Sequence, residues 1–225
     1  MANSCGVYTL CRDKRAVQET AEALFTLVAE TKGYPGYLGI SAVFRGWALA
    51  EEGHPAAAIG PMREGVAAYR ATGSELEVAY CLGLQAGAHR MAGQATAALC
   101  VLDEASALVE QTGERWYEAE LRRLRGMALL SLTEPDRAGA EACFGEAVAI
   151  ARARDARMWE LRAATALARL WAEQGERRRA YDMLAPIYGW FTEGFDTPDL
   201  VEAKALLNEL ASVPQDVRDT GTAGS

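Results

Sequence analysis

Three stretches of the chain share one pattern: LVAETKG (residues 27–33), AAYRATG (67–73) and LVEQTG (108–113). Each is a helix-forming run that ends in glycine, and the three glycines, Gly33, Gly73 and Gly113, are equally spaced. One further step along the chain, longer by two positions, leads to Asp155. A fixed period of about 40 residues is the sequence signature of a repeat protein, in which one structural unit recurs along the chain.

Small residues recur in the same register as these glycines. Two such series, with the same period, are Gly46, Ala86, Gly126 and Ala168, and Ala58, Ala98, Ala140 and Ala180. One interval of each series is longer by two positions, and both longer intervals agree on an insertion near 133–135. Helix axes approach closely only where a side chain is short, so we expect the helices of Gly46 and Ala58, and those of Gly126 and Ala140, to touch.

The repeating unit is predicted to be a pair of α-helices. Of the 225 residues, 44 are alanine, which favours helix and disfavours strand. Apolar residues follow helical spacing, as at Leu121, Leu124, Ala128 and Leu132. The expected helix pairs span residues 38–52 and 55–72, 76–92 and 95–112, 115–132 and 136–154, and 158–174 and 177–191. Since one pair cannot bury its own apolar face, the pairs are expected to stack into an α-solenoid.

The two ends of the array are less regular. A helix over about 13–32 matches the second helix of a preceding unit, but the first dozen residues look too short and too weakly periodic to form its partner. The first unit is therefore predicted to be partial, and a second copy of the chain could complete it as a homodimer. A last helix over 199–212 is expected to cap the stack. Residues 1–212 then form one repeat domain, followed by a disordered tail at 213–225.

Composition excludes several classes of protein. A net charge of −8 and a pI near 5.0 argue against a nucleic-acid partner. No stretch approaches the length of a membrane span, and no apolar segment follows a basic N-terminus as in a secretion signal, so we expect a soluble cytoplasmic protein. No metal site or cofactor is predicted, because the histidines lie far apart and no cysteine pair has ligand spacing. The five cysteines are expected to be reduced core residues: Cys5, Cys11, Cys81, Cys100 and Cys143.

The repeat resembles the tetratricopeptide-repeat (TPR) superfamily. The matching positions are Gly46, Gly53 and Ala58 in one unit, and Gly126, Ala140, Phe144 and Ala147 in another. The period found here, about 40 residues, is longer than the usual value of about 34. This resemblance implies an all-α, right-handed superhelix of antiparallel helix pairs.

Two longer strings, GERWYEAELRRLRGMALL (113–130) and MLAPIYGWFTEGFDTPDL (183–200), resemble a narrower group. They are similar to the C-terminal TPR region of bacterial signalling proteins that carry an adenylate or guanylate cyclase domain and a STAND-type ATPase. The chain has neither a GxxxxGK[ST] phosphate loop nor a cyclase domain, so neither activity is carried over. The resemblance implies a sensing or partner-binding module.

The first helix of each unit is expected to line the concave face, where outward positions one and two turns apart converge. On this basis the predicted partner-binding residues are Trp47, Tyr80, Arg90, Glu120, Arg123, Arg162 and Arg169. The early end of this groove is apolar and the late end is basic. Such a gradient suits an extended peptide with an acidic end, since the arginine fork binds both oxygens of a carboxylate.

Three functions stay open at this point. The first is a non-catalytic module that binds a protein or peptide in the concave groove. The second is a module that senses a small-molecule effector, and the third is an enzyme with its site in the groove. An open, continuous groove favours the peptide, whereas a closed cavity of about 300 Å³ or more with converging polar groups favours the effector. No catalytic motif is present, and no catalytic residue is predicted.

Overall fold

The protein is described by a computed structural model that covers residues 1–31 and 34–212. Gly33 and the predicted tail at 213–225 lie outside the described residues. Within the described ranges the chain is all-helical. The helices are α1 (Ala2–Leu10), α2 (Lys14–Thr31), α3 (Gly36–Glu51), α4 (Pro55–Arg70), α5 (Val78–Met91), α6 (Ala95–Thr112), α7 (Glu118–Leu130), α8 (Arg137–Ala153), α9 (Arg157–Glu173), α10 (Arg177–Tyr188) and α11 (Pro198–Ala211).

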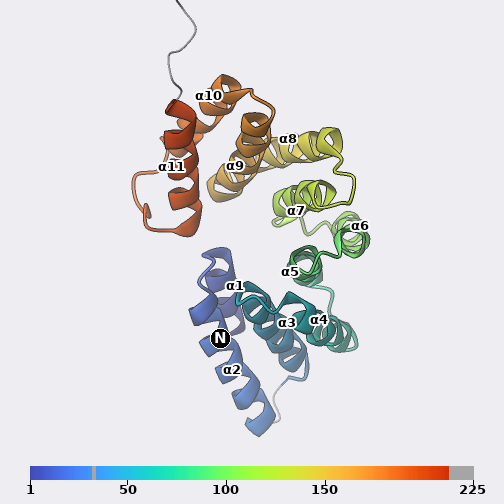
Figure 1. Cartoon of the computed structure of the whole chain (residues 1–225). Helices are drawn as coiled ribbons and strands as arrows, with labels where there is room; N and C mark the ends of the chain where they lie inside the picture. The colour runs from blue at the N-terminus through green and yellow to red at the C-terminus, as the bar shows by residue number, and fades with distance from the viewer. Residues whose placement is uncertain (32–33, 213–225) are drawn as a thin grey trace, which may run out of the picture.

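Consecutive helices pair into hairpins that stack side by side along a curved path (Figure 1). The pairs α3–α4, α5–α6, α7–α8 and α9–α10 are the four predicted units, and α11 packs against α9 and α10 as the expected last helix. The first helices α3, α5, α7 and α9 also contact one another in turn, so they form the inner layer of the superhelix. No helix in the described ranges is long and apolar enough to cross a membrane.

The N-terminal unit differs from the prediction. Residues 2–10 form α1, which packs against α2 and α3, and its Cys5 and Thr9 side chains are buried. The expectation that this segment forms no partner helix is therefore wrong. Its sequence signal is weak because small residues such as Asn3, Ser4 and Gly6 leave no continuous apolar stripe, and packing rather than propensity stabilises the helix. The unit is a short but complete hairpin, which removes the reason for expecting a second copy to complete it.

The repeated glycine position keeps its backbone conformation when glycine is replaced. Gly73 and Gly113 end helices with φ of +82° and +73°. Asp155, the equivalent residue one unit later, has φ of +51°. Aspartate tolerates this left-handed region better than most side chains do. The inferred equivalence of the three positions is confirmed.

Short side chains let the two helices of each hairpin approach closely. The alanines of the second series, Ala58, Ala98, Ala140 and Ala180, are all completely buried. A Cβ atom placed on Gly46 would collide with Met62 and come within 3.3 Å of the Ala58 carbonyl oxygen. A Cβ on Gly126 would lie 2.5 Å from the Phe144 ring. The predicted contacts within these hairpins are confirmed.

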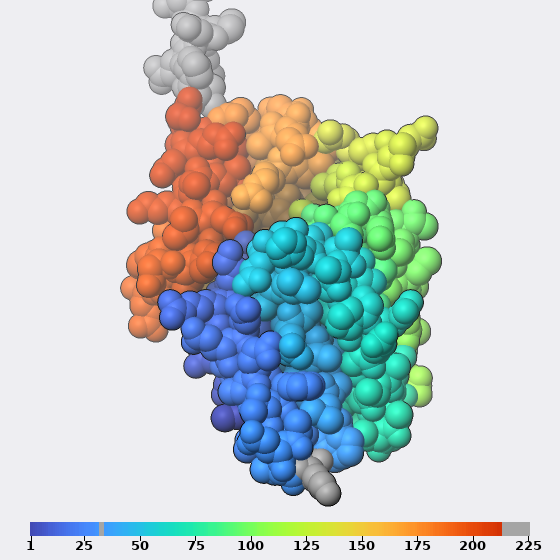
Figure 2. All heavy atoms as spheres, turned by 60° about the horizontal axis from the view of Figure 1, so that its bottom comes forward, coloured from blue at the N-terminus to red at the C-terminus, as the bar shows by residue number. Residues whose placement is uncertain are grey.

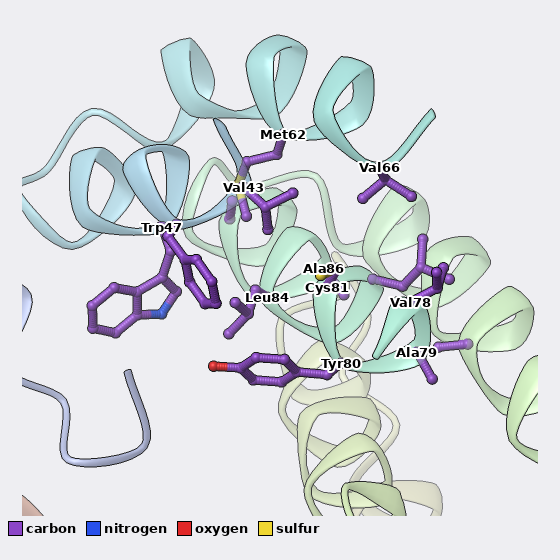
Figure 3. Packing of buried hydrophobic residues seen from close by; sticks show 14 of the residues in the cluster. Val43, Trp47, Met62, Val66, Val78, Ala79, Tyr80, Cys81, Leu84 and Ala86 are labelled. Atoms are coloured by element: carbon purple, nitrogen blue, oxygen red, sulfur yellow. The ribbon is translucent and has the colours of Figure 1, made fainter. Parts of the chain in front are cut away.

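The core continues from one hairpin to the next through apolar side chains on facing helices. Figure 3 shows Met62 and Val66 of α4 above Val43 of α3 and Cys81 of α5. Val43 and Met62 are fully buried. Trp47 and Tyr80 project to the other side of α3 and α5, toward the concave face (Figure 3). Each first helix therefore has one side in the core and another facing inward.

Substitution of Gly126 by leucine tests the close approach of α7 and α8. We expect a loss of more than about 1 kcal/mol in the free energy of unfolding, because the new side chain would overlap the buried Phe144 ring. Gly145→Leu is the matched control, since a Cβ at this α8 position meets no atom within 4 Å. Urea denaturation of the two variants measures the difference. Equal stability would contradict the assigned contact.

The cysteines divide into buried and exposed thiols rather than forming one core class. Cys5 and Cys81 are buried, and burial raises the pKa of Cys5 to about 11 and that of Cys81 to about 12. Cys143 is half-buried, whereas Cys11 and Cys100 are exposed, so the prediction of core residues is wrong for those two.

Thiol labelling tests this division. With a disulfide reagent near neutral pH, we expect Cys11 and Cys100 to react first. Cys5 and Cys81 should react only after denaturant is added, because they are buried and fully protonated. Mass spectrometry of labelled peptides identifies the modified residues. Early labelling of Cys81 in the folded protein would contradict its burial in the core on α5.

Candidate ligand-binding site

The two ends of the described chain meet across the concave face. Arg12, which follows α1, pairs with Asp199 at 3.2 Å and Glu202 at 2.7 Å, both on α11. Arg162 of α9 pairs with the same Asp199 at 2.6 Å and donates a hydrogen bond to the Leu10 carbonyl. In Figure 1 the ribbon of α1 faces that of α11 across a space, and in Figure 2 the atoms of the two segments touch. The solenoid therefore closes into a ring, held by a clasp that we define as Arg12, Arg162, Asp199 and Glu202.

Arg12 reaches the clasp from an unusual backbone conformation. Its φ of +58° lies in the left-handed region, which costs a non-glycine residue of the order of 1 kcal/mol. The tight turn between α1 and α2 imposes this conformation: the Asp13 amide donates to the Tyr8 carbonyl at 2.9 Å, and the Asp13 side chain accepts from the Ala16 amide. The turn directs the chain from α1 into α2 and places Arg12 beside α11.

A cavity of about 490 Å³ lies between the inner helices and the clasp. This size falls within the range of small-molecule sites. The residues that line it are Thr9, Leu10, Arg12, Trp47, Glu51, Tyr80, Gly83, Leu84, Gly87, Arg90, Met91, Tyr117, Glu120, Arg123, Leu124, Met127, Arg162, Thr165, Ala166, Arg169, Asp199 and Glu202.

All seven residues predicted from the repeat register line this one cavity: Trp47, Tyr80, Arg90, Glu120, Arg123, Arg162 and Arg169. Sequence reasoning missed the contributions of the two ends, namely Thr9, Leu10 and Arg12 on one side and Asp199 and Glu202 on the other. Thr9 and Leu10 belong to a helix that the periodicity did not reveal, and Arg12 lies in the turn that follows it. Asp199 and Glu202 lie at the start of α11. In the sequence, Pro198-Asp199 indicated the start of a helix but gave no sign that these carboxylates face the cavity.

One ion pair on the cavity wall is nearly desolvated. Arg123 donates to both oxygens of Glu120, from Nε at 2.8 Å and from Nη2 at 2.7 Å. The Glu120 side chain is only 5% exposed and that of Arg123 20%. Burial alone would lower the pKa of Arg123, but the Glu120 carboxylate outweighs it and the pKa is raised. The two side chains therefore satisfy each other's hydrogen bonds in a two-point ion pair.

Arg90 of α5 is different, because its guanidinium has no such partner. Among the described residues no carboxylate lies within the 4.0 Å of an ion pair with it, and its buried Nε has no hydrogen-bond acceptor. Burial lowers its pKa, the positive charge of Arg123 lowers it further, and Glu51 offsets only part of this. A buried guanidinium nitrogen without an acceptor is costly, so this group is suited to receive an external acceptor.

Tyr80 supplies a second unsatisfied polar group. Its side chain is 3% exposed, and its hydroxyl has no hydrogen-bond partner within the described residues. Burial raises the Tyr80 pKa, and the nearby Thr9 hydroxyl offsets part of this effect; because Thr9 donates its own proton to the Cys5 carbonyl at 2.7 Å, it can act toward Tyr80 only as an acceptor. The Tyr80 ring is held by edge-on packing against Tyr117, with ring centroids 4.8 Å apart. The hydroxyl is thus held at a fixed place on the cavity wall (Figure 3).

Two glycines on α5 line the cavity for different reasons. A Cβ on Gly83 would lie 2.6 Å from the Tyr117 ring and 2.9 Å from Leu121, so this glycine permits close packing of α5 and α7. A Cβ on Gly87 would meet nothing within 4 Å. Gly87 therefore leaves space in the cavity, and a larger side chain there would occupy that space rather than strain the fold.

The cavity wall carries a limited set of polar groups. The described lining contains no histidine, cysteine or lysine. Its two threonine hydroxyls donate to carbonyls of their own helices, Thr9 to Cys5 and Thr165 to Leu161. In the described ranges no three metal-ligating side chains come together. The groups left to contact a ligand are the guanidinium groups of Arg90 and Arg169, the Glu51 carboxylate, the Tyr80 hydroxyl and apolar surface.

Solved structures with the same architecture support the assignment of the fold. BtubC (BKLC) from P. vanneervenii has a TM-score of 0.62 at 15% sequence identity, over 96% of this chain and 98% of that chain. A Podosopora anserina protein, described as a putative kinesin light chain with nearly identical TPR-like repeats, has a TM-score of 0.59 at 18% identity, over 79% of this chain and 87% of that chain. The fold is a TPR-like α-solenoid. No protein-family model matches the sequence, and no curated relative matches it.

Removal of the Asp199 carboxylate tests the clasp. Asp199→Ala leaves Arg162, whose side chain is only 10% exposed, without its nearest anion. We expect the free energy of unfolding to fall by about 3 kcal/mol, because a nearly buried charge loses its partner. Glu19→Ala removes an ion pair with Arg15 on the surface and should leave stability unchanged. If Asp199→Ala were as neutral as Glu19→Ala in chemical denaturation, the clasp would contribute nothing to ring closure.

Proposed function

We propose that this chain is a non-catalytic, ligand-binding repeat module that takes a small molecule into the cavity at the centre of its ring. The observation that carries the proposal is the cavity itself: about 490 Å³, walled by all four inner helices, with two buried polar groups that lack partners. An unsatisfied buried polar group costs free energy, and a ligand that completes its hydrogen bonds recovers that cost.

The clasp favours a small molecule over an extended peptide. A peptide in the groove of a TPR-like solenoid would run along the concave face, from one end of the stack to the other. Here Arg12 crosses that face to pair with Asp199 and Glu202 of α11, and the Leu10 carbonyl at the end of α1 accepts a hydrogen bond from Arg162 of α9. A long peptide could be accommodated only after these ion pairs had separated. The effector alternative needs no such rearrangement.

The proposed role is regulatory. A ligand at the centre would contact α1, the inner helices and α11 together, because residues of all these elements line the cavity. Its binding would therefore stabilise the closed ring relative to any state in which the clasp is open. The resemblance of residues 113–130 and 183–200 to repeat regions of bacterial cyclase and STAND-ATPase proteins supports a cytoplasmic signalling context. In that context a protein partner would bind the outer surface of the ring, and its affinity would depend on whether the cavity holds a ligand.

A cavity-filling variant tests the proposal. Purified protein is incubated with the small-molecule fraction of a cell extract, re-isolated by gel filtration, and its retained compounds are identified by mass spectrometry. We expect the native chain to retain a compound that Gly87→Phe does not, because phenylalanine at this position would occupy the cavity. The retained compound should also raise the melting temperature of the native chain.

Gly145→Phe is the matched control for this experiment. Gly145 is also a helix glycine with nothing within 4 Å of its Cβ, but it lies on α8, away from the cavity. Both substitutions replace glycine within a helix, so both should keep the fold. Retention of the same compounds by the native chain and Gly87→Phe would overturn the proposal.

A further inference from the structure

We propose that the ligand is an organic anion, in which a carboxylate or phosphate monoester is bound by Arg90 and an apolar body lies against Trp47 and the neighbouring inner helices. This inference rests on the proposed function, since it concerns the same cavity. It follows from three features of the wall: its charges, the free guanidinium of Arg90, and the distribution of its apolar side chains.

The charges of the cavity do not balance. Five arginines and four carboxylates line it. Three of the arginines form ion pairs with carboxylates of the wall. Arg123 pairs with Glu120, and Arg12 and Arg162 pair with the two carboxylates of the clasp. Arg90 and Arg169 have no carboxylate within ion-pair distance among the described residues. Glu51 is the one carboxylate of the described lining that is not in an ion pair, so two unpaired positive charges stand against one negative charge. The complement of this surface is an anionic ligand.

Arg90 is the arginine best placed to bind it. It is half-buried, so an ion pair formed there is less weakened by water than one at the surface. Its neighbour Arg123 is held by two hydrogen bonds to Glu120 and adds positive potential without competing for the ligand. The planar guanidinium of Arg90 can donate two parallel hydrogen bonds to the oxygens of a carboxylate or phosphate.

The rest of the wall fits an apolar or aromatic body. Trp47, Leu84 and Leu124 line the cavity from α3, α5 and α7. Met91 and Met127 add flexible thioether side chains, which adapt to the shape of a bound molecule. The Tyr80 hydroxyl, which has no partner among the described residues, can form one directional hydrogen bond with a polar atom of that body. A ligand with a single acidic group and an apolar or aromatic portion satisfies all of these side chains.

A probe series that differs only in its head group tests this chemistry. The four probes are 3-phenylpropionate, 2-phenylethyl phosphate, 3-phenylpropanol and 3-phenylpropylamine, and binding is measured by calorimetry. We expect at least one of the two anions to bind about tenfold more tightly than the alcohol, since hydrogen bonds to a charged group contribute this much. The stronger of the two anions distinguishes a carboxylate ligand from a phosphate ligand.

Variants of two arginines assign the effect to Arg90. Arg90→Gln should abolish the preference for the anions, whereas Arg90→Lys should keep part of it, because lysine retains the charge but not the planar fork. Arg178→Gln is the control: Arg178 is 89% exposed and lies outside the cavity, so this variant should bind the probes as the native chain does.

Three results would overturn the inference: equal binding of all four probes, tightest binding of the amine, or no binding of any probe. Tightest binding of the amine would assign the head group to Glu51 instead. None of these results affects the retention experiment with Gly87→Phe, which detects a cavity ligand of any charge. A cationic or neutral compound retained there would therefore support the proposed function while rejecting the anion.

Discussion

The site depends on the ion pairs that the Asp199 carboxylate forms with two arginines. Asp199 lies at the start of α11 and binds both Arg12, beyond α1, and Arg162 on α9. Without this shared anion, the two guanidinium groups would lose the charge that offsets their mutual repulsion. With it, the concave face of an extended stack becomes the wall of a cavity. The ends of the chain, rather than the repeats alone, thus define the volume that a ligand could occupy.

The repeats impose a different constraint: they set how closely the two helices of a hairpin can approach each other. In two of the hairpins a glycine stands opposite a larger side chain: Gly46 opposite Met62, and Gly126 opposite Phe144. This spacing places the inner helices close enough for their inward residues to converge. Tyr117, for example, packs in the space left by Gly83 and holds the Tyr80 ring in turn. Packing in the core and the position of polar groups in the cavity are therefore linked.

Much of this arrangement could be predicted from sequence because it is periodic. The recurring glycines and alanines fix the hairpins, and helical geometry fixes which side of each first helix faces inward. That is why Trp47 and Arg169, which lie three units apart, could be assigned to one surface. Closure of the ring could not be predicted in this way. It depends on small rotations that add up over all the units, and it joins Arg12 to Asp199, two residues with no equivalents elsewhere in the repeat. The α1 helix was missed because tertiary contacts, not its own amphipathicity, stabilise it.

Closure also changes how such a stack unfolds. In a linear solenoid each unit is coupled only to its neighbours, and the terminal units, which have one neighbour each, fray first. The Arg12–Asp199 ion pair and the Arg162–Leu10 hydrogen bond add side-chain links between the N-terminal hairpin and the last helices. Each helical unit in the described part of the molecule then has a neighbour on both sides. Local unfolding of any one unit must therefore break contacts on both of its sides. A short helix such as α1 can thus share in the cooperativity of the whole array rather than unfold independently.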